Sequence, residues 1–147
     1  MRHKNSVFTI LLVEDEPADA FLVRMGFKEN KILVDLHHVE DGVEAFAFLH
    51  KEGRYQDAPC PDLILLDINM PRMDGLTFLQ KIKVMEKLRR IPVVVLTTSS
   101  AERDVLASYD YGAAGFVVKP MEVPQFMEVI RTLKDYWITL VQHPGED

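Results

Sequence analysis

Polar side chains that could do chemistry follow four short apolar runs of the sequence. They are Glu14 and Asp15 after residues 10–13, Asp67 after residues 63–66, Thr97 after residues 93–96, and Lys119 after residues 116–118. Clustered carboxylates repel one another unless a cation lies among them, and Mg²⁺ suits such oxygen ligands while leaving room for a phosphate oxygen. Because an aspartate can attack phosphorus, the set suits phosphoryl transfer onto Asp67, with Mg²⁺ and Lys119 neutralising charge.

The apolar runs themselves predict how these residues are brought together. Continuous stretches of Val, Ile and Leu are typical of parallel strands that are covered on both faces. A fifth candidate, residues 36–39, is weaker because His37 and His38 interrupt it. The carboxyl ends of parallel strands lie at one edge of an open sheet, where ligands bind. The polar residues after the runs are therefore expected to share one crevice.

Helical patterns separate the predicted strands. Pro17 fits a first helical position, and Asp41 with Glu44 is typical of a capping box. Further helices are predicted over residues 76–85, over 101–111 with an end at Gly112, and from residue 123 onward. The proposed apolar stripes are Ala18, Phe21, Leu22 and Met25 in the first helix, Val43, Phe46, Ala47 and Leu49 in the second, and Leu76, Leu79, Ile82, Val84 and Met85 in the third.

Alternation of strands and helices predicts the fold class. We expect an α/β, doubly wound (βα)5 sandwich with a five-stranded parallel sheet, of the flavodoxin-like kind. The polar segment 51–61 is predicted to be a long surface loop. One domain is expected over residues 7–141, with short tails at 1–6 and 142–147.

Composition excludes several classes of protein. The net charge of -6 disfavours a nucleic-acid binder, and the single cysteine, Cys60, excludes an internal disulfide. The sequence has no apolar run long enough for a membrane span, and its N-terminus lacks the apolar region of a signal peptide. A cytoplasmic location is expected, without nucleic acid or membrane as a partner.

Four motifs, in order, resemble the receiver domain of bacterial response regulators. They are ILLVED at residues 10–15, LLDINMPRMDG at 65–75, LT at 96–97 and GFVVKP at 115–120. The resemblance covers nearly the whole chain and rests on the combination of motifs. It implies a two-component phosphorelay in which a histidine kinase donates the phosphoryl group from a phosphohistidine.

The resemblance also implies roles for the residues at the predicted crevice. Asp67 would be the phosphoacceptor. Mg²⁺ would be held by Glu14, Asp15 and Asp67 together with the backbone carbonyl of Asn69, and Asp15 is the better candidate of the acidic pair for direct contact. The protein would not be a conventional enzyme, although it could catalyse its own phosphotransfer and dephosphorylation.

A second set of implied roles concerns the response to phosphorylation. Thr97 would be the switch hydroxyl, Phe116 the switch aromatic, and Lys119 the partner of the phosphoryl group, held by a cis bond to Pro120. Phe116 also suits plain core packing, and the two interpretations are compatible. Without other evidence, Glu14 to Glu16 would fit a solvated acidic turn that caps a helix.

The chain departs from the commonest receiver pattern in places. Thr98 follows Thr97 where many receivers have alanine, and Phe116 replaces the frequent tyrosine. The long 51–61 loop and the Tyr136-Trp137 ending resemble single-domain regulators paired with phytochrome-type kinases. The apolar ending also favours a homodimer formed through the C-terminal helices and the last strand.

Other functions fit the sequence less well than the phosphorelay does. A receiver fold could act as an interaction module without phosphorylation, and loss of Asp67 or Lys119 would have favoured that. A small phosphohydrolase usually has a second aspartate where this chain has Asn69, together with a substrate-covering cap. Dinucleotide binding is disfavoured because the sequence has no G-x-G-x-x-G motif after the first predicted strand.

Overall fold

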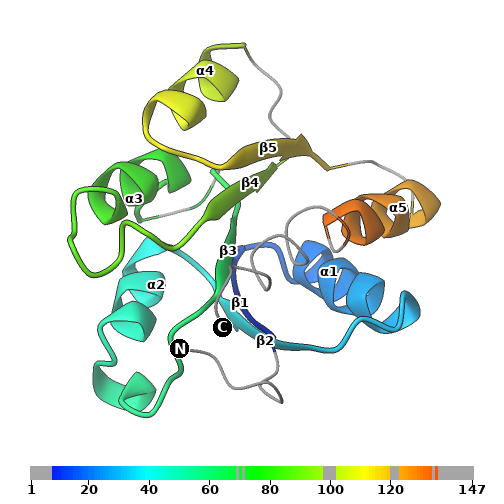
Figure 1. Ribbon diagram of the computed structural model, residues 1–147, viewed down its shortest axis with the longest axis horizontal. Helices are drawn as coiled ribbons and strands as arrows, with labels where there is room; N and C mark the ends of the chain where they lie inside the picture. The colour runs from blue at the N-terminus through cyan, green and yellow to red at the C-terminus, as the bar shows by residue number, and fades with distance from the viewer. Residues whose placement is uncertain are drawn as a thin grey trace.

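The computed structural model describes residues 8–68, 70, 72–97, 102–119, 123–133 and 135. Five parallel strands form one sheet in the order β2-β1-β3-β4-β5, as Figure 1 shows. The strands are β1 (Phe8–Val13), β2 (Val34–Val39), β3 (Leu63–Leu66), β4 (Val93–Thr97) and β5 (Gly115–Val118). The helices are α1 (Pro17–Glu29), α2 (Gly42–Leu49), α3 (Gly75–Ile82), α4 (Glu102–Asp110) and α5 (Val123–Leu133), with a 3-10 turn η1 (Gly53–Tyr55). The predicted fold class is confirmed.

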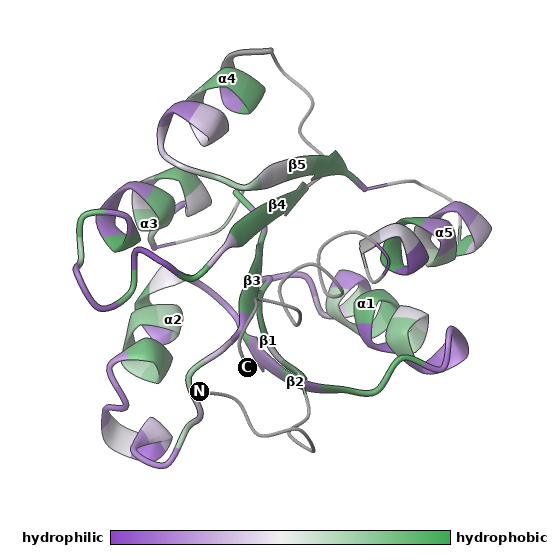
Figure 2. Cartoon of the chain, viewed as in Figure 1, coloured by the Kyte–Doolittle hydropathy of each residue, from purple (hydrophilic) through white to green (hydrophobic). Residues whose placement is uncertain are grey.

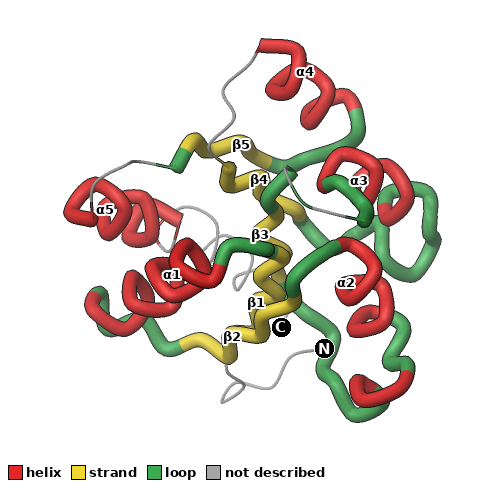
Figure 3. The backbone as a smooth tube through the Cα atoms, turned by 180° about the vertical axis from the view of Figure 1, so that it is seen from behind, coloured by secondary structure: helices red, strands yellow, loops and turns green. Residues whose placement is uncertain are grey.

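Helices cover both faces of the sheet. Helices α1 and α5 lie on one face and α2, α3 and α4 on the other, in both the front view and the view from behind (Figures 1 and 3). Alternate residues of β1 enter different cores: Ile10 and Leu12 join the core under α1 and α5, whereas Leu11 and Val13 join the core under α2 and α3. The central strands are therefore mainly apolar, with Thr9 and Thr97 as the exceptions, and β3 and β4 have the green colour of hydrophobic residues in Figure 2.

Local signals set the ends of several helices as predicted. Pro17 opens α1, and the Asp41 side chain caps α2 by accepting a hydrogen bond from the backbone N–H of Glu44 at 2.9 Å. Asp74 caps α3 by accepting from the backbone N–H of Thr77 at 2.8 Å. Past the end of α4, Gly112 has a φ of +99°, a conformation that favours glycine.

The proposed helix stripes were partly wrong. Phe21 of α1 is 60% exposed, because the helix instead buries Ala20, Val23 and Phe27. Gly26 allows α1 to approach α5 closely: a Cβ at Gly26 would lie 2.6 Å from Cγ1 of Ile130.

Three other stripe residues are also exposed, and Ala18 in the first turn of α1 is one of them. Val43 at the start of α2 is 43% exposed, since the helix buries Ala45, Phe48 and Leu49 instead. Val84 is 80% exposed because α3 already ends at Ile82.

The register between β1 and β3 is fixed at the amino edge of the sheet by a side chain. The backbone N–H of Thr9 donates to Oδ2 of Asp62 at 2.9 Å, and the N–H of Asp62 donates to the carbonyl of Thr9 at 2.8 Å. The strand pairing then begins with Ile10 opposite Leu63. Asp62 thus supplies both a backbone and a side-chain contact immediately before β3.

Some predictions lie outside the described residues. The domain boundaries at 7 and 141, the Lys119–Pro120 bond, and Tyr136 with Trp137 belong to this group. Among the helices that are described, none is long and apolar enough to cross a membrane.

The central strands predict where stability is most sensitive to substitution. Leu65 is fully buried in β3, so Leu65→Ala is expected to lower the free energy of unfolding by about 2–5 kcal/mol through lost burial and a residual cavity. Val84→Ala removes an 80% exposed side chain and is expected to change the free energy by less than about 0.5 kcal/mol. Urea unfolding followed by circular dichroism measures both, and equal effects would contradict this assignment of the core.

Candidate functional site

The predicted chemical residues lie at the carboxyl edge of the sheet. Glu14, Asp67 and Lys119 each come one residue after the end of β1, β3 and β5. Backbone hydrogen bonds continue past the strands, from the N–H of Glu14 to Val39 at 3.0 Å and from the N–H of Asp67 to Val13 at 3.0 Å. Because these bonds extend the parallel ladder, Glu14 and Asp67 are held on adjacent strands.

Three carboxylates form a compact cluster at this edge. Glu14, Asp15 and Asp67 each offer an oxygen, and these oxygens all lie within 4.8 Å of one another. Glu14 is 1% and Asp67 7% exposed, whereas Asp15 is half-buried. Burial raises the pKa of the Glu14 carboxyl to about 8, and the nearby Asp67 charge acts in the same direction while Lys119 opposes it. Buried carboxylates at this spacing fit a hard divalent cation, which would offset their repulsion.

Lys119 is a buried cation beside these carboxylates. Its Nζ lies 2.6 Å from Glu14 Oε1, 2.8 Å from Asp19 Oδ2 and 3.6 Å from Asp67 Oδ2. Burial works against the ammonium charge, but hydrogen bonds to Asp19 and Glu14 outweigh it and raise the pKa of Lys119 above its usual value. Lys119 is therefore charged at neutral pH. Its ammonium also lies within ion-pair distance of Asp67.

Asp19 is a site residue that the sequence analysis missed. It lies in the first turn of α1 and shares the Lys119 ammonium with Glu14. A sequence signal was available: α1 begins directly after the acidic turn that leaves β1, so its first turn must lie near the carboxyl edge. An acidic residue there could have been included in the cluster.

The Glu14 position is fixed by further contacts. Its Oε2 accepts from the backbone N–H of Glu16 at 3.1 Å, and its carbonyl oxygen lies 2.7 Å from Nε2 of His38. Since a carbonyl only accepts, His38 donates through Nε2. His38 thus ties β2 to the acidic turn.

The structure describes the switch residues only in part. Thr97 is the last residue of β4 and pairs with Val118, which places its backbone at the carboxyl edge; its side chain lies outside the described part, as do Asn69 and Thr98. Phe116 is half-buried on β5. This exposure is compatible with both the core and the switch interpretation.

Comparison with known families identifies the chain. The model of the response regulator receiver domain matches residues 10–131. The chain belongs to this family. Receiver domains are phosphoacceptors of two-component systems, generally without enzymatic activity, and they bind a divalent metal; the carboxylate cluster of this receiver fits that property.

Individual relatives agree with this assignment. The receiver is 42% identical over 136 residues to the response regulator Rcp1 of a Synechocystis species, with 92% of each chain covered. It is similar in structure to the phosphorylated cyanobacterial phytochrome response regulator RcpA, with a TM-score of 0.87, 38% identity, and 92% and 96% coverage. The Mn²⁺-bound form of Rcp1 gives a TM-score of 0.86 and 40% identity, with 94% and 99% coverage. The predicted family and phosphorelay class are confirmed.

The buried ion pairs of Lys119 predict a large effect on stability. Lys119→Met keeps the apolar stem but leaves Glu14 and Asp67 buried without their cation. The free energy of unfolding in metal-free buffer at pH 7 is therefore expected to fall by about 3 kcal/mol. Lys81→Met, at an exposed position of α3, serves as the matched control and is expected to leave stability nearly unchanged. Equal stability of both variants in urea would show that Lys119 does not hold the cluster together.

Proposed function

We propose that Asp67 accepts a phosphoryl group from the phosphohistidine of a histidine kinase, with Mg²⁺ as the divalent cation. One observation carries the proposal: the Asp67 carboxylate lies within 4.8 Å of oxygens of Glu14 and Asp15, and its Oδ2 is 3.6 Å from the Lys119 ammonium. An incoming phosphoryl group would therefore meet a cation site and a fixed ammonium. Such positioning and charge neutralisation are what phosphoryl transfer requires.

The residues would divide the reaction between them. An Asp67 oxygen attacks phosphorus, the bond from phosphorus to the histidine nitrogen breaks, and the electron pair of that bond returns to the imidazole. Glu14, Asp15, Asp67 and the backbone carbonyl of Asn69 would hold Mg²⁺, which would supply positive charge to the phosphoryl oxygens. The Lys119 ammonium would add a further positive charge. Its hydrogen bonds to Glu14 and Asp19 hold it in place.

The signal would then pass to the surface. Thr97 would donate its hydroxyl to the phosphoryl group and Phe116 would change its packing, so that phosphorylation shifts a two-state equilibrium of α4, β5 and α5. The names of Rcp1 and RcpA support a phytochrome-type kinase as the donor. Autodephosphorylation, the domain limits 7–141 and a cytoplasmic location stay predictions from the sequence.

Phosphorylation by acetyl phosphate tests the proposal directly. Intact-mass measurement should show a gain of one phosphoryl group that requires Mg²⁺, and Asp67→Asn should abolish it because the nucleophilic oxygen is lost. Beryllofluoride binding is measured in parallel, since a short-lived phosphoryl group could escape detection. If neither adduct forms on the wild-type chain, the protein acts as an interaction module that needs no phosphorylation.

A homodimer formed through α4, β5 and α5 is the second part of the proposal. Exposed apolar side chains support it: Leu106 is 56%, Val118 44% and Val123 50% exposed. Val118→Asp should shift the chain to monomer in sedimentation equilibrium, because a charge there would be buried in the interface. Leu33→Asp, at an 80% exposed apolar residue before β2, is the matched control and should leave the dimer intact. A wild-type chain that is monomeric both with and without beryllofluoride would refute the dimer.

A further inference from the structure

The loop between β3 and α3 returns directly against the residue from which it starts. The backbone N–H of Gly75 donates to the carbonyl of Ile68 at 3.0 Å. A Cβ at Gly75 would lie 2.4 Å from the carbonyl oxygen of Asp67 and 2.5 Å from Cα of Ile68, so only glycine fits there. The end of the loop therefore lies in contact with the backbone of Asp67, whose carboxylate belongs to the cluster.

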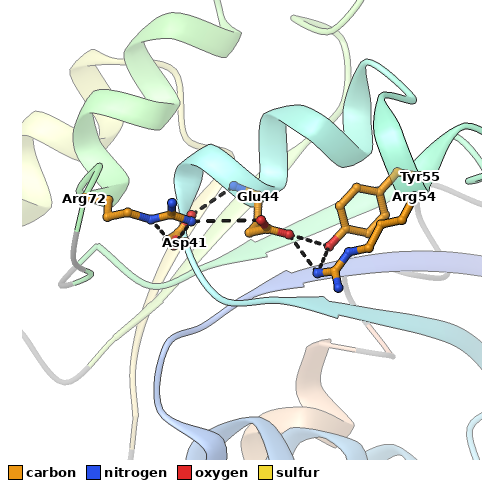
Figure 4. A network of polar contacts seen from close by, with 5 residues as sticks. All are labelled: Asp41, Glu44, Arg54, Tyr55 and Arg72. Atoms are coloured by element: carbon orange, nitrogen blue, oxygen red, sulfur yellow. Dashed lines mark hydrogen bonds and ion pairs between the residues drawn. The ribbon is translucent and has the colours of Figure 1, made fainter.

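An ion pair fastens the outer part of this loop to α2. Nε and Nη2 of Arg72 lie 2.8 and 2.6 Å from Oδ2 of Asp41, whose side chain is 7% exposed (Figure 4). The neighbouring Met73 packs on the start of the same helix, where a Cβ at Gly42 would lie 2.9 Å from its sulfur. The loop is thus held to α2 by both a charged and an apolar contact.

Asp41 is well suited to act as the anchor of this ion pair. Its Oδ1 caps α2 through the backbone N–H of Glu44, which leaves Oδ2 for Arg72. Glu44 is a weaker partner: its Oε2 is 4.0 Å from Arg72, while its Oε1 accepts from Tyr55 at 2.6 Å and Arg54 at 2.9 Å. Figure 4 shows these contacts as one row along the start of α2.

Two observations separate this pair from an incidental surface ion pair. Exposed pairs contribute little to stability, but here one carboxylate is buried and meets two nitrogens of one guanidinium. Arg72 also has a φ of +64°, a left-handed conformation that is unfavourable for a residue with a side chain. The ion pair and the packing of Met73 hold the backbone there against that preference.

We propose that Arg72 is a positioning residue for the metal and phosphoryl site. Its ion pair with Asp41 fixes the β3–α3 loop, the segment that contains Asn69, relative to Asp67. The inference rests on the proposed function, because the site it serves is the Mg²⁺ and phosphoryl site described above. Arg72 touches neither group itself and acts through the loop, as residues beyond the ligands commonly do at metal sites.

The sign of the charge effect makes the proposal testable. Removing the positive charge of Arg72 would by itself strengthen Mg²⁺ binding to an acidic site, whereas removing the negative charge of Asp41 would by itself weaken it. If positioning dominates, both Arg72→Gly and Asp41→Asn weaken binding. Glycine accepts the left-handed backbone, and asparagine retains the helix cap, so both variants are expected to fold.

Competition of Mg²⁺ with Mn²⁺, followed by the electron paramagnetic resonance of free Mn²⁺, measures the affinities. We expect the Mg²⁺ dissociation constant to rise about tenfold in Arg72→Gly and in Asp41→Asn, and the Mg²⁺ concentration that half-saturates phosphorylation by acetyl phosphate to rise in parallel. Arg54→Ala removes the same charge from the same row but touches neither the loop nor Asp41. It is expected to keep the wild-type affinity.

The outcomes separate this inference from the proposed function. Unchanged or tighter Mg²⁺ binding in Arg72→Gly, in a wild-type background that binds Mg²⁺ and is phosphorylated, overturns the positioning role alone. A wild-type chain with neither saturable Mg²⁺ binding nor an adduct overturns both. Urea unfolding shows whether each variant is folded, and if Arg72→Gly is not, Arg72→Gln, which also removes the charge but keeps a side chain, is measured in its place.

Discussion

A buried ammonium among carboxylates is the interaction on which the carboxyl edge of this protein depends. Lys119 follows β5, Glu14 follows β1, and Asp19 comes from α1, yet all three meet within hydrogen-bond distance. Removing the lysine charge from such a buried group would leave the carboxylates without compensation. The cluster therefore holds elements that are distant in sequence in the geometry that chemistry at Asp67 needs.

The cluster contains more negative than positive charge, and this excess favours the binding of a divalent cation. One lysine faces Glu14, Asp19 and Asp67, and Asp15 adds a further carboxylate nearby. Burial raises the pKa of Glu14, and the nearby Asp67 charge raises it further, so a divalent cation at this site would relieve both effects. A fully neutral cluster would be more stable and would have less affinity for a metal.

The sequence predicted the sheet, its parallel direction, and the meeting of Glu14, Asp15, Asp67 and Lys119 at one edge of it. These predictions succeeded because an apolar strand followed directly by a charged residue is a strictly local pattern. The helix faces were harder: Phe21 is exposed and Ala20 buried because α5 approaches α1 at Gly26, a contact between segments about a hundred positions apart. Asp19 and Arg72 were missed for the same reason, since each is defined by a partner from another element.

The contact of Asp62 with Thr9 has a consequence at the opposite end of the sheet. In a parallel pair of strands, the alignment of the amino ends determines the alignment of the carboxyl ends, and a slip by one residue turns every side chain to the other face. Asp62 is hydrogen-bonded to Thr9 of β1 through both its backbone and its carboxylate. A residue outside the carboxylate cluster thus helps to fix the register that places Glu14 and Asp67 at the same level on adjacent strands.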